Sequence, residues 1–312
     1  MILANTTGKF GDTVFRTVLV IFASTILVIV AAMIDIMVWN SLPTIEAFGL
    51  GFLTGREWQP ASDIYGALPF VYGTIVSSLI ALVIAVPISL GIAVFLVEQA
   101  PKKIATPIAF LVELLAAIPS VVYGLWGIFV LAPFIRDHLG VFLQTYFGWL
   151  PLFQGRLTGI GMLTGGIIMA LMVTPIVTAV VRDVLEVVPT TQREAALALG
   201  ATKWETTKIV LGNAASGIAG AVVLGLGRAL GETMAVTMVI GNAPQITASL
   251  FEPAYTIASV LAANFAEATD KLYLSALIEM GLVLFLVTFV VNGLAKLLVA
   301  RVARGTGTAK AS

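Results

Sequence analysis

Long, unbroken runs of apolar residues dominate the pattern of hydrophobic and polar positions along this chain. A helix that crosses a bilayer needs about 20 mostly apolar residues, and six runs reach that length. The runs are continuous rather than alternating, which disfavours the strands of an outer-membrane barrel. We therefore expect an all-α membrane protein, a polytopic bundle of about six transmembrane helices over Thr17–Trp39, Phe70–Val97, Ile108–Ile135, Ile160–Val181, Ala214–Ile240 and Tyr273–Val299.

The distribution of lysine and arginine predicts the orientation of these spans, because cytoplasmic loops carry an excess of both residues. With the N-terminus inside, 12 basic residues fall on the cytoplasmic side and 4 on the outer side. We expect a multi-pass membrane protein with both termini cytoplasmic. The cytoplasmic set is Lys9, Arg16, Lys102, Lys103, Arg182, Arg193, Lys203, Lys208, Lys296, Arg301, Arg304 and Lys310; the outer set is Arg56, Arg136, Arg156 and Lys271.

The composition agrees with a membrane protein and argues against several function classes. Hydrophobic residues make up 59% of the chain and charged residues 11%, against roughly 25% charged residues in soluble proteins. The 17 basic and 17 acidic residues balance, so a basic surface for nucleic acid is not indicated. There is no cysteine and one histidine, His138, which argues against a thiol nucleophile or a multi-histidine metal site. We expect no catalytic residues and no metal site on this chain.

The predicted cytoplasmic loop before the fifth span is more ordered than a simple linker. Thr191 and Glu194 have the spacing of a capping box, and Gly200 suits the left-handed residue that ends a helix. Thr202 and Glu205 repeat the capping spacing, which predicts a second helix immediately afterwards. Such a short, alanine-rich helix could transmit a push from a soluble partner, or it could lie on the membrane surface and hold two spans apart.

The fifth span contains Arg228 and Glu232, whose separation of four residues places them on one helix face where they can pair. An arginine at the bilayer centre costs at least about 2.5–3.5 kcal/mol on insertion scales. Counting about 1.5 Å per residue from Ala214 places Arg228 on the order of 20 Å into the bilayer core, in its outer half. The guanidinium fork suits bidentate recognition of an oxyanion. We expect this pair to lie on a substrate path; the alternative is an ion pair that locks two spans together.

Three further acidic residues lie in the apolar runs, and we expect each to be structural rather than to contact substrate. They are Asp35, Glu113 and Glu279. Glu279 is the second candidate for a site residue, because it has no adjacent base and needs a partner from another helix. Prolines interrupt the second, third and fourth spans, where we expect kinks, at Pro87, Pro119 and Pro175.

The loop also carries a resemblance to a known family. Glu194-Ala195-Ala196, followed by Gly200, resembles the EAA loop of ABC importer permeases. In that family the loop forms a coupling helix that seats on the ATPase subunit, which implies this role for Glu194, Ala195, Ala196 and Gly200. About ten residues later the family pattern has Leu-Pro, where this chain has Gly212-Asn213, so the entry into the fifth span departs from the pattern.

A more specific likeness lies in three other segments, Ala117–Trp126, Gly227–Val236 and Asn264–Ala268. They closely resemble the permease subunit of the phosphate-specific ABC importers, of the PstC type. The likeness implies the type I permease fold and transport roles for Arg228 and Glu232. It also implies a heterodimer with a PstA-type permease, two cytoplasmic ATPase subunits that hold ATP and magnesium, and an external phosphate-binding protein.

These interpretations together divide the chain into three parts and leave the function with open alternatives. We expect a cytoplasmic segment over residues 1–15, a permease domain over 16–300 with its coupling loop at 182–208, and a cytoplasmic tail over 301–312. The chain has no G-x-x-x-x-G-K-[ST] motif, so ATP must be hydrolysed by another subunit. The alternatives are an importer of sulfate or molybdate, a carrier that works without an ATPase, and, least supported, a membrane-embedded enzyme.

Overall fold

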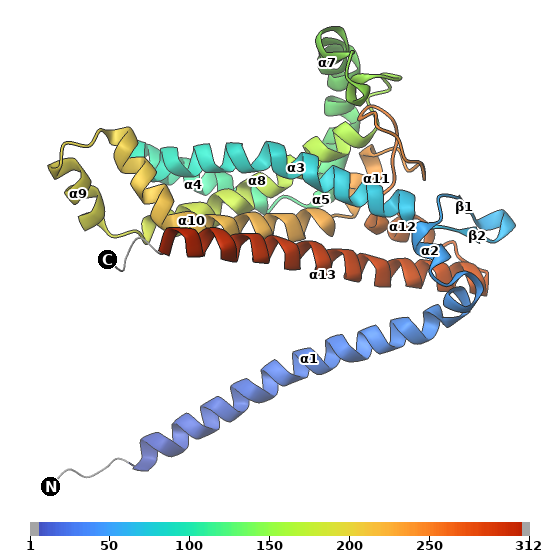
Figure 1. Cartoon of the computed structure of the whole chain (residues 1–312), viewed down its shortest axis with the longest axis horizontal. Coiled ribbons are helices and arrows are strands. Elements are labelled where there is room, and N and C mark those ends of the chain that lie inside the picture. The colour runs from blue at the N-terminus through green and yellow to red at the C-terminus, as the bar shows by residue number, and fades with distance from the viewer. Residues whose placement is uncertain (1–5, 308–312) are drawn as a thin grey trace.

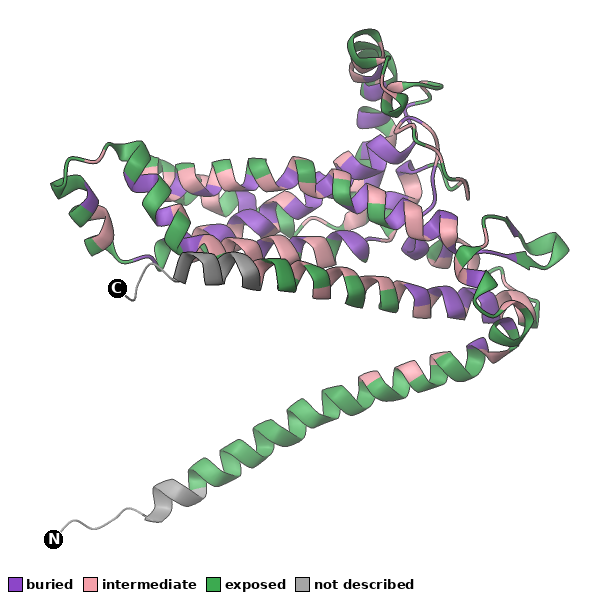
Figure 2. Cartoon of the chain, viewed as in Figure 1, coloured by how far each residue is buried: buried purple, intermediate pink, exposed green. Residues whose placement is uncertain are grey.

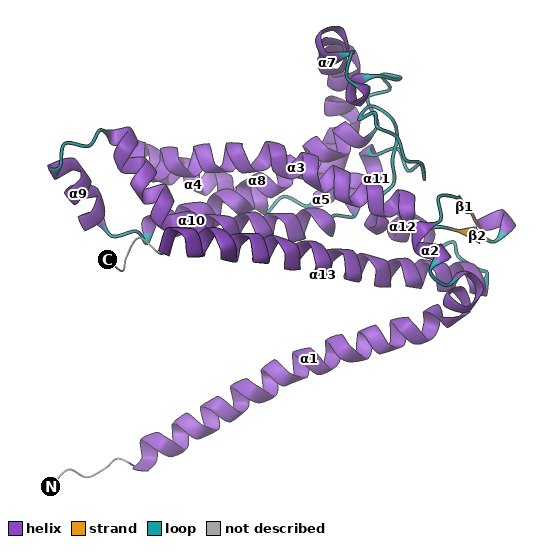
Figure 3. Cartoon of the chain, in the orientation of Figure 1, coloured by secondary structure: helices purple, strands orange, loops and turns teal. Residues whose placement is uncertain are grey.

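The computed structural model describes residues 6–307, with side-chain surroundings for residues 11–299, and this part of the chain is mostly helical (Figures 1 and 3). Six of its helical segments are long and apolar enough to cross a membrane, which confirms the predicted polytopic bundle. Of the predicted terminal segments, residues 1–5 and 308–312 lie outside the described residues.

The order of elements follows the predicted runs, with additional short helices and one small hairpin. The principal helices are α1 (Thr6–Phe48), α3 (Leu68–Val94), α4 (Lys102–Ala116), α5 (Ser120–Trp126), α7 (Gly140–Phe147), α8 (Met162–Glu186), α9 (Thr190–Ala198), α10 (Lys203–Leu230), α11 (Met234–Val239), α12 (Ile257–Asn264) and α13 (Lys271–Gly307). Short helices α2 (Gly51–Thr54) and α6 (Ala132–Phe134), 3₁₀ turns Pro60–Ser62 and Pro151–Phe153, π-helical turns Phe95–Gln99, Gly127–Leu131 and Ile135–Leu139, and strands β1 (Trp58–Gln59) and β2 (Ile64–Tyr65) complete the chain.

The two ends of the bundle differ in structure. Helix α9 lies at one end, together with the first described turns of α1 and the last of α13 (Figure 1). The antiparallel pair β1–β2, in which Trp58 faces Tyr65, lies at the other end with α2 and α12 (Figure 1). We call these the α9 end and the hairpin end.

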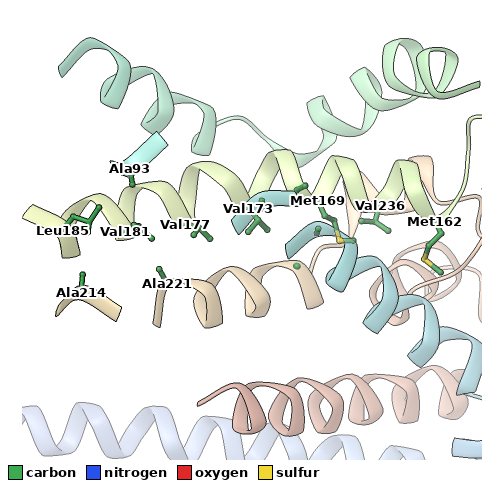
Figure 4. Packing of buried hydrophobic residues seen from close by; sticks show 14 of the residues in the cluster. Ala93, Met162, Met169, Val173, Val177, Val181, Leu185, Ala214, Ala221 and Val236 are labelled. Atoms are coloured by element: carbon green, nitrogen blue, oxygen red, sulfur yellow. The ribbon is translucent and has the colours of Figure 1, made fainter. Parts of the chain in front are cut away.

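Helix α8 is the centre of the bundle and packs between α3 and α10. Its buried stripe repeats every four residues, as one face of a helix does, at Met169, Val173, Val177, Val181 and Leu185 (Figure 4). Small residues of the neighbouring helices face this stripe and let the backbones approach closely: Ala81, Ala85, Ala214 and Ala221.

Glycine permits α10 to approach α8 closely at Gly225. A Cβ atom added to Gly225 would come within 2.7 Å of Val177 and 2.9 Å of Val173, closer than real side chains tolerate. Pro87 and Pro175 lie inside α3 and α8 without ending either helix. The Ser89 hydroxyl donates to the carbonyl of Thr174 at 3.0 Å, so a hydrogen bond joins the two helices beside Pro175.

Helix α1 is anchored at the hairpin end and diverges from the other helices along the rest of its length (Figure 1). Ser41 and Thr44 are fully buried, and the Thr44 hydroxyl donates to Ser275 of α13 at 2.7 Å. Most of the remaining described residues of α1 are exposed (Figure 2). The helix is also longer than the predicted span Thr17–Trp39, because polar residues at both ends continue the helix beyond the apolar run.

The predicted third span over Ile108–Ile135 is divided at Pro119 rather than only kinked there, and the helical run long enough to cross a membrane is Ser120–Phe147. Helix α4 ends at Ala116 and α5 begins at Ser120. Pro119 lacks the N–H that would continue the helix, and a proline disfavours helical geometry in the residue before it. The helical run resumes with α5 and continues to Phe147, so that α7 stands away from the bundle (Figure 1).

Candidate functional site

The Arg228–Glu232 pair forms, but not on one continuous helix as predicted. Helix α10 ends at Leu230 and α11 begins only at Met234, so the predicted fifth span over Ala214–Ile240 is broken. Gly231 is the residue at which the helix stops, consistent with the low helix propensity of glycine. Arg228 therefore lies in the last turn of α10, where a cation is favoured by the helix dipole, and Glu232 lies in the connection.

The two charges of this pair have different surroundings. Arg228 Nη1 and Glu232 Oε2 are 2.5 Å apart, and the side chains are 41% and 4% exposed respectively. Glu232 Oε1 also accepts the N–H of Ala235 in the first turn of α11, at 3.4 Å. The carboxylate is thus held in place from two sides, while the guanidinium keeps a free face. This arrangement can present a positive, multi-donor group to an anion.

The free face of Arg228 borders a groove of about 460 Å³ between α8, α10 and α13. Lys296 and the amide of Asn292, both from α13, line the same groove. The sequence analysis did not predict this, because these residues and Arg228 come from different helices. Residues that line the groove are Ile176, Val223, Leu224, Gly227, Arg228, Asn292 and Lys296.

The level of the pair within the bundle follows from its neighbour on α13. A Cβ atom on Gly227 would meet Asn292 Nδ2 at 3.8 Å, so this level of α10 lies against Asn292 of α13. Asn292 is 21 residues from Lys271 and 15 from Gly307, the bounds of α13. The pair therefore lies near the middle of α13, and its predicted position in the outer half of the bilayer stays a prediction.

Helix α9 is the predicted coupling helix. Its first turn differs from the prediction, whereas its end at Gly200 agrees with it. It begins at Thr190 after Pro189, without a side-chain cap, so the predicted Thr191–Glu194 capping box is wrong. At the other end Gly200 has φ +84°. Ala201 N–H donates to Ala196 O and Gly200 N–H to Leu197 O, both at 3.0 Å, which is the Schellman arrangement.

The second helix begins where the sequence placed it. Thr202 is the N-cap of α10, its hydroxyl accepts the N–H of Glu205, and the Glu205 carboxylate accepts the N–H of Thr202. Only four residues thus separate α9 from α10, which restricts the angle between them. The predicted helix–glycine–helix pattern of this loop is confirmed.

An arginine anchors α9 to the bundle, a role that the sequence did not reveal. Arg193 donates to Glu98, at the end of the second span, with Nη2–Oε1 at 2.8 Å and Nε–Oε1 at 3.0 Å. It also donates to the carbonyls of Leu185 and Val188, at 3.0 and 2.6 Å. Asn213 of α10 donates to Gln192 Oε1 at 2.6 Å. Polar contacts therefore connect α9 to the ends of three spans.

The four predicted coupling residues fall on two sides of α9. Glu194, Ala195 and Gly200 are exposed, as a docking surface requires. Ala196 is buried at 6% exposure, so it packs against its own chain and cannot contact a partner directly. Leu197 and Leu199 are exposed at 52% and 89%, which gives this tip an apolar surface that the sequence analysis did not single out.

We expect Gly200→Ala to weaken coupling by straining the end of α9. A Cβ at Gly200 would meet nothing within 4 Å, so the cost comes from its left-handed backbone, about 1–2 kcal/mol for a residue with a side chain. In a reconstituted complex, substrate transported per ATP should fall severalfold. Gly212→Ala is the matched control, because that glycine is also uncrowded but lies inside α10; equal effects of both changes would contradict the prediction.

The other acidic residues of the spans have varied surroundings. Glu279, the predicted second candidate, is buried at 8% exposure in α13, far along the helix from Asn292. Its Oε2 has no hydrogen-bond partner among the described residues, so the partner expected from another helix is not found there. Glu113 pairs with Arg182 of α8 at 2.9 Å, in agreement with a structural role, and Asp35 is exposed on α1. Among the described side chains of residues 11–299, no cluster of metal-ligating residues occurs.

Comparison with known proteins places the chain among transport permeases. Residues 85–304 match the family described as "Binding-protein-dependent transport system inner membrane component". The phosphate transport system permease protein PstC of Xylella fastidiosa (strain Temecula1) is 46% identical over 302 residues, covering 95% of this chain and 93% of that protein. PstC of Pasteurella multocida is 44% identical over 301 residues, covering 95% and 94%.

A more distant likeness exists among solved structures. A chain of the inward-facing MetNI methionine ABC transporter aligns with a TM-score of 0.49 and 19% identity over 76% of this chain and 94% of that chain. The type I permease fold is therefore assigned from the family match and the six apolar helices rather than from this alignment. A multi-pass membrane protein with a transport role follows from the same two findings. The chain belongs to the family of binding-protein-dependent transport system inner membrane components, in which it is similar to the PstC-type permeases.

Proposed function

We propose that this chain is the transmembrane permease subunit of an ATP-driven phosphate importer and that it forms one wall of the translocation path. The observation that carries the proposal is the Arg228–Glu232 pair, whose guanidinium is 41% exposed on a groove within the apolar bundle. An exposed guanidinium cannot face lipid at this depth without a large cost. On a path for an oxyanion, the guanidinium can bind the passing anion. The names of the relatives support phosphate as that anion.

The proposed complex contains partners that meet the two ends of the bundle. A PstA-type permease completes the path. Two cytoplasmic ATPase subunits bind the two permeases, one of them at the tip formed by Glu194, Ala195 and Gly200. An external phosphate-binding protein docks at the hairpin end. Both termini and α9 are cytoplasmic in this proposal, in agreement with the distribution of basic residues. The chain itself holds no cofactor; ATP and magnesium bind to the ATPase partners, which perform the hydrolysis.

The proposed mechanism is alternating access. ATP binding closes the two ATPase subunits, which displace α9, and its contacts with Glu98, Leu185 and Val188 carry that displacement to the second and fourth spans. The spans open outward, phosphate enters past Arg228, and hydrolysis resets the complex. Glu232 neutralises Arg228 when no anion is present and competes with the anion for it, which favours release.

Reconstitution of this chain into vesicles with its partners tests the proposal. Phosphate uptake is expected only when the sister permease, both ATPase subunits, the binding protein and ATP are all present. Uptake by this chain without an ATPase would identify a self-sufficient carrier instead. Competition by sulfate or molybdate at concentrations that match phosphate would assign the importer to another oxyanion.

A further inference from the structure

We propose that Lys296 and Asn292 form a second contact for the transported oxyanion, one helical turn beyond Arg228 toward the α9 end. The proposal rests on the proposed function, since it concerns the same path. Both residues line the groove that Arg228 borders, and they lie four positions apart on α13, so they project from one face of that helix. An anion that leaves Arg228 toward the α9 end would meet the amide first and the ammonium next.

Lys296 differs from Arg228 in having no counter-charge. Arg228 is neutralised by Glu232 at 2.5 Å, whereas Lys296 forms no ion pair with any residue in the described range 11–299. No acidic side chain lines the groove. The groove with its Arg228–Glu232 pair therefore carries a net positive charge that comes from Lys296 alone. An anion drawn from a neutral pair toward an unpaired cation moves down an electrostatic gradient.

Asn292 adds a polar group whose bonding is incomplete. Its Oδ1 is buried and has no hydrogen-bond partner among the described residues, a state that is costly inside a protein. Its amide lies against Gly227, where a Cβ would be 3.8 Å from Nδ2 and 4.0 Å from Oδ1. The amide carries two donors and an acceptor. Because Oδ1 is buried, the amide nitrogen is the atom of this side chain that a phosphate in the groove can contact, with a phosphate oxygen accepting from Nδ2.

The same chemistry could recognise a lipid headgroup instead, because a lysine near the end of a span often reaches toward the interface. The shared ligand is a phosphate oxyanion, and its two sources predict different behaviour. A transported anion makes Lys296 necessary in any bilayer. A lipid headgroup makes the effect of replacing Lys296 depend on the fraction of anionic lipid.

Phosphate uptake by the complete reconstituted complex tests the proposal with Lys296→Gln. We expect uptake to fall on the order of tenfold, as the loss of one charge-assisted contact implies, while ATP hydrolysis stimulated by the binding protein is retained. Lys296→Arg should keep most of the uptake. Asn292→Asp, which is isosteric and adds a negative charge, should lower uptake further. The matched control is Lys208→Gln, an exposed lysine of α10 that lies outside the groove and should have no effect.

Three results would overturn the proposal. Normal uptake by both Lys296→Gln and Asn292→Asp would show that the groove beyond Arg228 is not used. A defect that appears in vesicles with anionic lipid and disappears in purely zwitterionic vesicles would assign Lys296 to a headgroup. An equal defect in Lys208→Gln would indicate a general effect of charge at this end. If Arg228→Gln abolishes uptake but Lys296→Gln does not, only this inference fails; if Arg228→Gln transports normally, the proposed function itself fails.

Discussion

Phosphate uptake by the reconstituted complex is expected to fall at least about a hundredfold when Arg228 is replaced by glutamine. Hydrogen bonds to charged groups contribute about 1.5–3 kcal/mol each, and a guanidinium can offer two to one oxyanion. Glutamine retains an amide donor but neither the charge nor the planar fork. Arg228→Lys keeps the charge as a point and should restore uptake in part, because lysine cannot form the bidentate contact.

The control for this variant must separate transport from stability. Removing Arg228 leaves Glu232, at 4% exposure, without its counter-charge, and breaking a fully buried pair costs about 3–5 kcal/mol. The cost is smaller here because Arg228 is partly exposed. The double variant Arg228→Gln/Glu232→Gln removes both charges and should assemble as well as the native complex. If the double variant assembles and also transports phosphate at the native rate, Arg228 is not on the path.

The helices of this chain could be predicted from local signals, and the places where they break could be predicted less well. Apolar length indicated six crossings, although the third lies further along the chain than predicted, and the Thr202–Glu205 spacing located the start of α10. Pro87 and Pro119 look alike in sequence, yet the first lies inside α3 and the second separates α4 from α5. Packing of the neighbouring helices decides between these outcomes, and a single sequence does not contain that packing.

In the candidate site too, contacts between residues close in sequence could be predicted, and contacts between different helices could not. Arg228 and Glu232 are four residues apart, so their pairing was visible in the sequence, although the helix end at Leu230 was not. Asn292 and Lys296 come from a helix more than sixty positions later, and nothing local marks them as neighbours of Arg228. The sequence motif named Ala196 as a coupling residue, but the direction in which that side chain points depends on how α9 docks.

The anchoring of α9 is the clearest contact of this long-range kind. Arg193 and Glu98 are 95 positions apart and form a pair whose side chains are 19% and 9% exposed. The pair holds α9 against the end of the second span, and the carbonyl contacts of Arg193 hold it against the fourth. We therefore expect displacement of α9 to reach the second span through this side chain, and we propose Arg193 as a positioning residue for coupling.

Arg193→Ala is accordingly expected to uncouple ATP hydrolysis from uptake. Phosphate transported per ATP hydrolysed should fall at least about tenfold, while the ATPase subunits still bind and hydrolyse ATP, because the exposed residues of α9 that would contact them are unchanged. Arg182→Ala is the matched control. Arg182 is 20% exposed and pairs with Glu113 at 2.9 Å, much as Arg193 pairs with Glu98 at 2.8 Å, but it makes no contact with α9.

The loss of coupling should persist when the unpaired charge of Glu98 is also removed. Arg193→Ala strands Glu98 in a buried position, so the complex should lose thermal stability as well as coupling. Adding Glu98→Gln removes that buried charge and should recover stability without recovering coupling, since α9 still lacks the side-chain contacts of Arg193 with the ends of the second and fourth spans. Recovery of both properties in the double variant would show that Arg193 serves only to neutralise Glu98, and coupling would then have to pass through the Gln192–Asn213 contact with α10.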